Sequence, residues 1–407
     1  MTSPSTMLQR SPDACWGVID GVEEDQLVLW SSSERRLRVL NHTAASVWNM
    51  FGRPRSQSEL VEAMAETYGA STATVEPDVV RLVDELVDSG FLCSSTDLRL
   101  SITDPARTSD PPRSFNADMM TIGPIQALGS SIMVSVTDPE LHSGLSAILD
   151  PLTAPAAGSE ADPLIEIVIE RTGELFTVIR DGEVCTRSSN TEHILRSVLA
   201  EINSAPLDHV RSAVVLHAAG AAFSSATSAT DESLVVFPAV SNAGKSTLVT
   251  QLCLRGHAYL TDEAVAIQVD SLEAQPFHKS ICIEFSAQKV LSELADVAPS
   301  PTLSKTWDID PRQVGSGRLA HAGPIAAIVF PRFSHGATTN IEPLEPFEAL
   351  QRLIANAFDF ASVGQPAFRA LVRLANTVPA FALDHGGDGT QLDELEHLSG
   401  SFQNFVV

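Results

Sequence analysis

A lysine and two hydroxyl residues follow a loop of small residues near the middle of the chain. Residues Ser241 to Thr247 read SNAGKST, directly after the apolar run SLVVFP and directly before the amphipathic stretch TLVTQLCLRG. A strand, a glycine-containing loop and a helix in this order place backbone N–H groups and the positive end of a helix around nucleotide phosphates. The pattern therefore predicts ATP binding. The alternative is an ordinary turn whose residues only cap a helix.

Each position of this segment has an expected part in holding ATP and Mg²⁺. Lys245 would reach the β- and γ-phosphates, and the Ser246 hydroxyl would ligate Mg²⁺. Ala239 stands where the general pattern has its first glycine. The residues expected to contact ATP are Ser241, Asn242, Ala243, Gly244, Lys245, Ser246 and Thr247.

Two adjacent acids follow in the stretch HAYLTDE, where Asp262 lies 17 positions after Lys245. That distance fits one helix and a tight return, so we expect a strand beside the loop strand that brings Asp262 near the γ-phosphate. Asp262 would take a proton from an attacking hydroxyl, while Glu263 and Ser246 would hold Mg²⁺ at a site that Asp262 also borders. The alternative is a solvated acidic turn.

Three further side chains are candidates for the same site. His217, in LHAAGAAF one strand before the loop, is either an active-site residue that tunes the acid–base group or a hydrogen-bonded core histidine. Lys279, in PFHKSICIE, and Arg332, in FPRFS, are each either a phosphate contact or a surface cation.

The elements that must position these residues form an α/β unit. From about residue 117, strand-like runs such as LIEIVIERTG alternate with helical stretches such as TEHILRSVLAEIN, which predicts an α/β domain. Before it, WGVIDGVEEDQLVLW and RRLRVLN predict three short strands. Three amphipathic stretches then predict helices, the second opened by a capping box from Ser56 to Glu59. This first block predicts a small α+β domain of winged-helix type.

The chain divides accordingly into a tail, two domains and a linker rich in Ser, Pro and Asp. The expected boundaries are 1–13 for a flexible tail, 14–95 for the small domain, 96–116 for the linker and 117–407 for the α/β domain, which contains a small α/β part (117–205), a nucleotide-binding core (206–345) and a helical C-terminal part (346–407).

The composition excludes several classes of partner. A formal net charge of −25 repels nucleic acids and anionic membrane surfaces. The N-terminus lacks a signal-peptide core, and no apolar run reaches the length of about 18 residues that spans a bilayer. The five cysteines are scattered and odd in number, which argues against a disulfide framework. We expect a cytoplasmic protein.

The stretches LHAAGAAF, VVFPAVSNAGKSTL and AYLTDEAVAI, with the later element FPR, resemble the HPr kinase/phosphorylase superfamily over roughly Ala117 to Phe360. The resemblance implies a P-loop fold that transfers a phosphoryl group from ATP to a hydroxyl. It places the strand histidine of that superfamily on His217, the loop residues on Lys245 and Ser246, and the acidic pair on Asp262 and Glu263. Members of the superfamily often assemble into rings, so the resemblance allows a homo-oligomer but leaves the oligomeric state open.

The first block resembles the PqqD-like domains of ribosomal peptide biosynthesis. The similarity lies in LNHTAASVWNMF, SELVEAMAETYG and EPDVVRLVDELVDSGFL, in that order. It implies a domain that holds the leader of a precursor peptide as an added strand at a sheet edge. It also implies other peptide-maturation enzymes as partners.

Together the two resemblances imply an ATP-dependent kinase that phosphorylates a Ser or Thr hydroxyl of a precursor peptide docked on the N-terminal domain. One alternative is a kinase of a small hydroxylated metabolite. Another is a peptide chaperone, without catalysis, that nucleotide binding controls.

Overall fold

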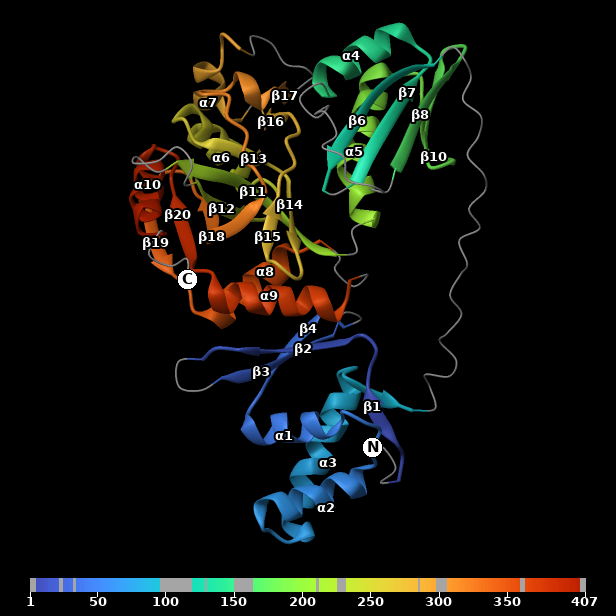
Figure 1. Cartoon of the computed structure of the whole chain (residues 1–407), viewed down its shortest axis with the longest axis vertical. Helices are drawn as coiled ribbons and strands as arrows, with labels where there is room; N and C mark the ends of the chain where they lie inside the picture. Colours follow the sequence, from blue (N-terminus) through green and yellow to red (C-terminus); the bar gives the residue numbers. More distant parts are fainter. Residues whose placement is uncertain are drawn as a thin grey trace. The chain divides into compact units, whose positions relative to one another are not determined.

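The structure is a computed structural model that describes residues 5–21, 25–31, 34–95, 119–128, 130–149, 164–209, 212–224, 232–284, 286–297, 306–358 and 363–402. The chain forms two compact units (Figure 1). The first unit joins Met1–Asp110 to Glu345–Gln351 and Asp359–Thr377, and the second contains the remaining residues. The expected linker, 96–116, lies outside the described residues. Among the described residues, no helix is both long and apolar enough to cross a bilayer.

The N-terminal part of the first unit has the predicted strands and helices. An antiparallel sheet in the order β2-β3-β4 is followed by three helices, and a short strand pair, β1 with β5, lies apart from that sheet. The bounds are β1 (Leu8–Arg10), β2 (Ala14–Ile19), β3 (Gln26–Ser31), β4 (Arg36–Leu40), α1 (His42–Met50), α2 (Gln57–Tyr68), α3 (Thr72–Asp88) and β5 (Leu92–Ser94).

Local signals start the first two helices. The Asn41 side chain accepts from the N–H of Ala44 at the start of α1. The predicted capping box is confirmed, because both reciprocal bonds between Ser56 and Glu59 are present. The expected flexible tail, 1–13, is wrong in part, since it contains β1. Leu8 is buried in the core of the unit and anchors that strand.

Helix α9 (Gln365–Thr377) comes from the far end of the sequence and lies along β2 (Figure 1). The Gln365 amide bonds both the N–H and the C=O of Trp16, at 2.8 and 2.7 Å. The Asn376 amide donates to the Val18 carbonyl at 3.0 Å and accepts from the Asp20 N–H at 3.2 Å. Two side-chain amides therefore satisfy alternate backbone groups along the edge of β2. The expectation that 346–407 forms one helical part of the α/β domain is wrong, because α9 belongs to the first unit.

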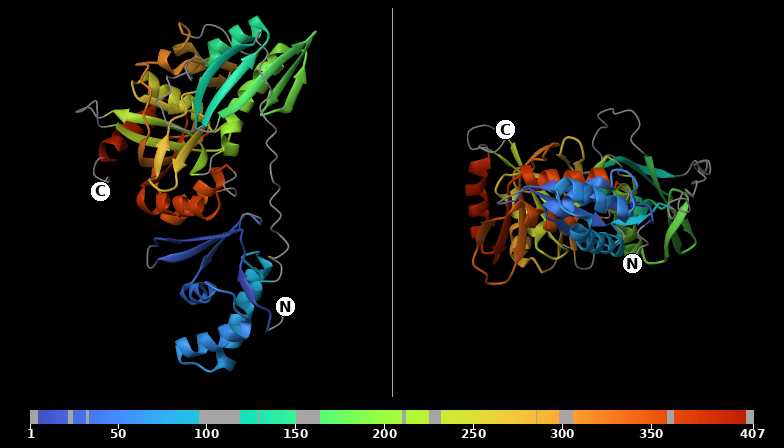
Figure 2. Two further views of the ribbon diagram at one scale, coloured as in Figure 1. Left: turned by 45° about the vertical axis from the view of Figure 1, so that its right-hand side comes forward. Right: turned by 90° about the horizontal axis from the view of Figure 1, so that it is seen from below.

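The second unit contains two larger sheets. The first has the order β10-β9-β8-β7-β6, and helices α4 and α5 pack on it (Figure 2). Isoleucine and valine side chains from its strands form a core with these helices. The bounds are β6 (Met120–Ala127), β7 (Ser130–Val136), α4 (Pro139–Leu149), β8 (Leu164–Thr172), β9 (Leu175–Arg180), β10 (Glu183–Ser188) and α5 (Thr191–His209).

The other sheet has eight strands in the order β12-β11-β14-β15-β18-β20-β19, with β13 paired to β11. A further parallel pairing of β12 with β18 closes five of these strands on themselves. The bounds are β11 (Ala213–Ser224), β12 (Glu232–Pro238), α6 (Lys245–Leu254), β13 (Ala258–Thr261), β14 (Ala264–Gln268), β15 (Glu273–Gln275), β18 (Gly323–Phe333), β19 (Asn340–Pro343), β20 (Ala380–His385) and α10 (Thr390–Phe402). The remaining elements are β16 (Ile281–Glu284), α7 (Gln288–Glu293), β17 (Thr306–Ile309), a 3₁₀ turn at Pro311–Gln313 and α8 (Pro346–Asn356).

The expected return strand differs from the structure in two ways. It is split into β13 and β14 at the acidic pair, and both pieces pair with β11. The loop strand β12 instead lies between β11 and β18. Strands β13 and β14 both run antiparallel to β11 along successive parts of its length, so Asp262 and Glu263 lie in a break between two strands that share one neighbour. This break still brings both acids to the region of Lys245, whose pKa is lowered by burial while the charges of Glu263 and Asp262 partly offset that lowering.

Candidate functional site

The loop between β12 and α6 has the backbone of a tight turn. Gly244 has a φ of 86° and Asn242 a φ of 65°. Glycine adopts this left-handed conformation freely, and asparagine tolerates it better than most residues. Gly244 is the N-cap of α6 and supplies no side-chain cap, so the first N–H groups of the helix have no side-chain acceptor at their cap. The loop and the positive end of the helix thus form a site suited to an anion.

Lys245 is buried and folds back under this loop. Its Nζ donates to the carbonyl oxygens of Ala239 at 2.9 Å and Val240 at 3.0 Å, and it lies 3.1 Å from Nε2 of His217. Because an ammonium has no acceptor, Nε2 of His217 accepts this bond and the ring proton lies on Nδ1. Burial and the Lys245 charge lower the pKa of His217 to about 4, so its imidazole is neutral near neutral pH.

The two acids have opposite surroundings. Asp262 is 1% exposed, and its Oδ1 lies 2.7 Å from Nζ of Lys279. Tyr259 donates its hydroxyl to Oδ1 at 3.0 Å, and the Cys282 N–H donates to Oδ2 at 3.1 Å. The Glu263 side chain is 42% exposed, and its Oε1 is 3.8 Å from Nε2 of the neutral His217. Asp262 is therefore held by three donors, whereas Glu263 faces outward beside His217.

The two cations that the sequence left ambiguous lie in different environments. Lys279 is 7% exposed, so the surface-cation interpretation is wrong for it. Burial lowers its pKa, but the Asp262 carboxylate raises it and gives a net upward shift. Arg332 is exposed at the end of β18 and forms two hydrogen bonds with the Asp384 carboxylate of β20.

The sequence-predicted residues thus divide into two groups. Contacts link His217 to Lys245 and Glu263, and a second pair, Asp262 with Lys279, adjoins them because Asp262 precedes Glu263 in the chain. Arg332 belongs to a separate pair on β18 and β20. Sequence reasoning missed Tyr259. It lies within the quoted stretch HAYLTDE, but its contact with Asp262 depends on the bend between β13 and β14.

The donor set can be tested for Mg²⁺. Among the described residues, no cluster of three or more His, Cys, Asp or Glu side chains is arranged to bind a metal. Mg²⁺ on a nucleotide takes one or two protein oxygens and completes its shell with phosphates and water, so it needs no such cluster. The half-buried Ser246 and the outward Glu263 fit that requirement. Asp262 fits less well, because both of its oxygens already accept from protein donors.

Comparison with known proteins supports the N-terminal part of this description. Residues 26–92 match the family model described as Coenzyme PQQ synthesis protein D (PqqD). The match begins at β3, runs through the three helices and ends at the start of β5, so it lies inside the first unit. A search of curated proteins finds no match to the chain. The chain therefore carries a PqqD-like domain at residues 26–92.

Proposed function

We propose that this protein is an ATP-dependent kinase that phosphorylates a Ser or Thr hydroxyl of a precursor peptide held by its PqqD-like domain. The observation that carries the proposal is the convergence of Lys245, His217 and Glu263 at the start of α6. A structural turn needs no buried lysine beneath its carbonyls and no outward carboxylate beside it. Both are what transfer of a phosphoryl group requires.

Phosphate binding would use groups that are already in place. Phosphate oxygens would accept from the backbone N–H groups of the loop and of the first turn of α6. The Lys245 ammonium would exchange its two carbonyl partners, Ala239 and Val240, for phosphate oxygens, which is favourable because a charged acceptor forms stronger hydrogen bonds. Ser246 would hold Mg²⁺ beside the phosphates, where the ion would neutralise their charge.

The transfer step also assigns the proton. The peptide hydroxyl oxygen would form a bond to the γ-phosphorus while the bond from that phosphorus to the β–γ bridging oxygen breaks, and ADP would leave. The hydroxyl proton would pass to Glu263, the acid whose carboxylate faces outward. Neutral His217 would position that carboxylate from 3.8 Å.

Asp262 receives a different role from the one that the sequence suggested. Its carboxylate is buried and accepts from Lys279, Tyr259 and the Cys282 N–H, so an outside hydroxyl has no open route to it. We assign it to holding the break between β13 and β14 in place. It would act on the reaction only by positioning Glu263, its neighbour in the chain.

The sheet of the first unit suggests where the peptide binds. The edge of β2 is covered by the amides of α9, so the other edge strand, β4, is the candidate. The N–H and C=O of Trp16 point to α9, so Trp16 and Leu29 are a non-hydrogen-bonded pair between β2 and β3. The backbone groups of Leu29 then point to β4, so Leu29 and Arg38 are a hydrogen-bonded pair. Along β4 the backbone groups of Leu37 and Val39 therefore point outward.

These outward groups have the properties of a docking edge. Among the described residues, none of the backbone bonds outside the sheet involves Leu37 or Val39. Val39 is 37% exposed, so an added strand would find both unpaired backbone groups and an apolar side chain. Docking there would raise the local concentration of the acceptor hydroxyl at the kinase site.

The experiment that tests the proposal is phosphate transfer from γ-labelled ATP to small peptides encoded beside this gene. Label should appear on a peptide Ser or Thr and disappear in Lys245→Ala and Glu263→Gln. A β4 variant, Val39→Pro, should abolish peptide binding while ATP binding persists, because proline removes an outward N–H. Binding of ATP and peptide without transfer would point to the chaperone alternative, and transfer to a small hydroxylated metabolite would point to the other.

A further inference from the structure

The carboxyl ends of three neighbouring parallel strands lie beside the anion-binding loop. Strand β12 pairs with β18, and β18 pairs with β20, in both cases parallel. Ligands of open α/β sheets bind at such ends. Strand β18 continues past the end of β12, and a Cβ added at Gly244 would lie 3.6 Å from Cβ of Phe333. Phe333 therefore stands next to the residue that precedes Lys245.

Phe333 is an exposed aromatic residue at the end of a buried strand. The residues from Ile325 to Pro331 are all buried, whereas Phe333 is 45% exposed. Its ring packs against the glycine-rich loop that follows β20, where a Cβ added at Gly387 would lie 3.1 Å from its Cε2 atom. One side of the ring is thus supported by protein, while nearly half of the side chain remains open to solvent.

The residue paired with Phe333 is a buried histidine with unused hydrogen-bonding groups. His385 is 4% exposed, and its ring lies 5.6 Å from that of Phe333 in an edge-on arrangement. Within the described part of the chain, neither of its ring nitrogens has a hydrogen-bond partner. Burial lowers its pKa, so the neutral ring keeps one donor and one acceptor. Leaving both groups unpaired costs stability, and a ligand that hydrogen-bonds to either nitrogen would recover part of that cost.

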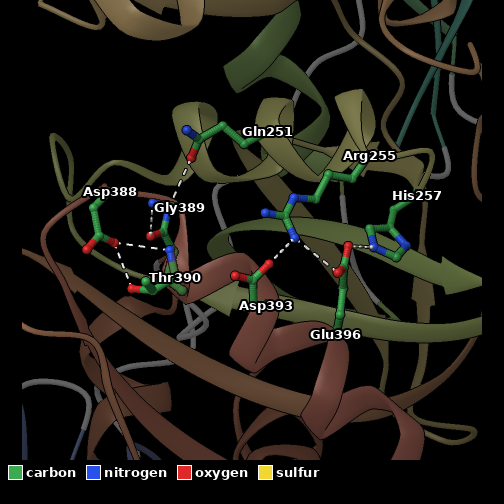
Figure 3. A network of polar contacts seen from close by, with 9 residues as sticks. Gln251, Arg255, His257, Asp388, Gly389, Thr390, Asp393 and Glu396 are labelled. Atoms are coloured by element: carbon green, nitrogen blue, oxygen red, sulfur yellow. Dashed lines mark hydrogen bonds and ion pairs between the residues drawn. The ribbon is translucent and has the colours of Figure 1, made fainter.

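The loop after β20 is fastened to the helix of the anion site (Figure 3). The Gln391 amide donates to Gln251 of α6 at 3.3 Å and accepts from the Gly389 N–H at 3.0 Å. Arg255, one residue after α6, pairs with both Asp393 and Glu396 of α10. A ligand that contacts both the anion-binding loop and the loop after β20 would thus bind between two loops whose spacing these bonds keep fixed.

We propose that Phe333 and His385 form the subsite for the purine base of the nucleotide whose phosphates occupy the loop before α6. The base stacks on the Phe333 ring, and rotation of this exposed ring lets a His385 nitrogen form a hydrogen bond with the base. The inference rests on the proposed nucleotide binding, and it adds that affinity depends on the base as well as on the phosphates.

The test compares ATP with inorganic tripolyphosphate by titration calorimetry on the full chain. Phe333→Ala should weaken ATP binding about tenfold, the effect of losing one stacked base, and leave tripolyphosphate binding unchanged. His385→Leu should weaken ATP binding about fivefold without lowering Tm, because it removes the two unpaired nitrogens. Tyr68→Ala is the matched control, since Tyr68 is equally exposed at 46% and lies in the other unit.

The outcomes separate this inference from the proposed function. Equal loss of ATP and tripolyphosphate binding in Phe333→Ala, or no loss of either, would refute the base subsite. The proposed binding of phosphates by Lys245 and its loop would remain supported in that case. A lower Tm in His385→Leu with unchanged ATP affinity would show that His385 has only a packing role. If the wild-type protein binds neither ligand, or if Lys245→Ala changes neither affinity, both the proposed function and the subsite fail.

Discussion

Neutralising Asp262 should loosen the second unit before it affects any chemistry. In Asp262→Asn the volume is kept, but the new amide has one acceptor and one donor where the carboxylate had two acceptors. Whichever way it turns, its NH₂ faces either the Lys279 ammonium or the Cys282 N–H. Lys279 is 7% exposed and would remain buried without its counter-ion. Breaking such a buried pair from one side costs about 3–5 kcal/mol.

Removing both charges should restore most of this loss. Asp262→Asn combined with Lys279→Met leaves an apolar side chain where the ammonium was, and a buried pair replaced from both sides is often close to neutral. We therefore expect the double variant to be more stable than Asp262→Asn alone. That order would show that the penalty comes from the unpaired Lys279 charge.

Amide hydrogen exchange of peptides spanning β11 and β14 measures this effect in the unit concerned. A loss of about 3 kcal/mol corresponds to exchange at least about a hundredfold faster. Glu263→Gln serves as the matched control, because its side chain is 42% exposed and its exchange should equal that of the wild type. Wild-type exchange in Asp262→Asn together with loss of phosphate transfer would refute the anchoring role. It would indicate that Asp262, and not Glu263, accepts the proton of the peptide hydroxyl.

Three further predictions concern single residues. In the folded protein the pKa of His217 is about 4, below its ordinary value of 6.5. The contribution of its neutral ring to the free energy of unfolding is therefore constant above about pH 6.5 and is lost as the pH falls toward 4. Unfolding titrations should therefore show wild type losing about 2–3 kcal/mol more than His217→Gln between about pH 7 and about pH 4.5. Gly17→Ala would put a Cβ 2.9 Å from Val372 and should cost about 1–3 kcal/mol by denaturant unfolding, with Val372→Ala as the rescue. Ser56→Ala should cost about 1 kcal/mol in the same assay, because the side-chain acceptor at the start of α2 is lost.

Short-range features of this chain were predictable because their causes lie within a few residues. The capping box of α2 needs only Ser56 and Glu59, three positions apart. The start of α6 at Lys245 follows from a glycine that tolerates a positive φ after a buried strand. In both cases the residues that determine the structure are neighbours in the sequence.

Long-range pairing was not predictable by the same means. A strand that follows a loop and a helix can return on either side of its predecessor, and nothing in HAYLTDE indicates that β13 and β14 both pair with β11. The Asp262–Lys279 pair has the same origin, because it forms only where this long-range pairing brings the two residues together. Asp262 was therefore correctly associated with the site, but its surroundings could not be inferred.

Helix α9 shows how spacing can be matched between elements that are distant in sequence. Gln365 and Asn376 are 11 positions apart, which is about three turns or 16 Å of helix. Trp16 to Asp20 spans about 13 Å of strand, so two amides on one helix can reach both ends of the β2 edge. An unprotected edge invites pairing with any extended chain. Because the residues that protect β2 come from beyond position 364, a fragment ending near residue 95 would expose two edges, whereas with α9 in place β4 is the single open edge of this sheet among the described residues.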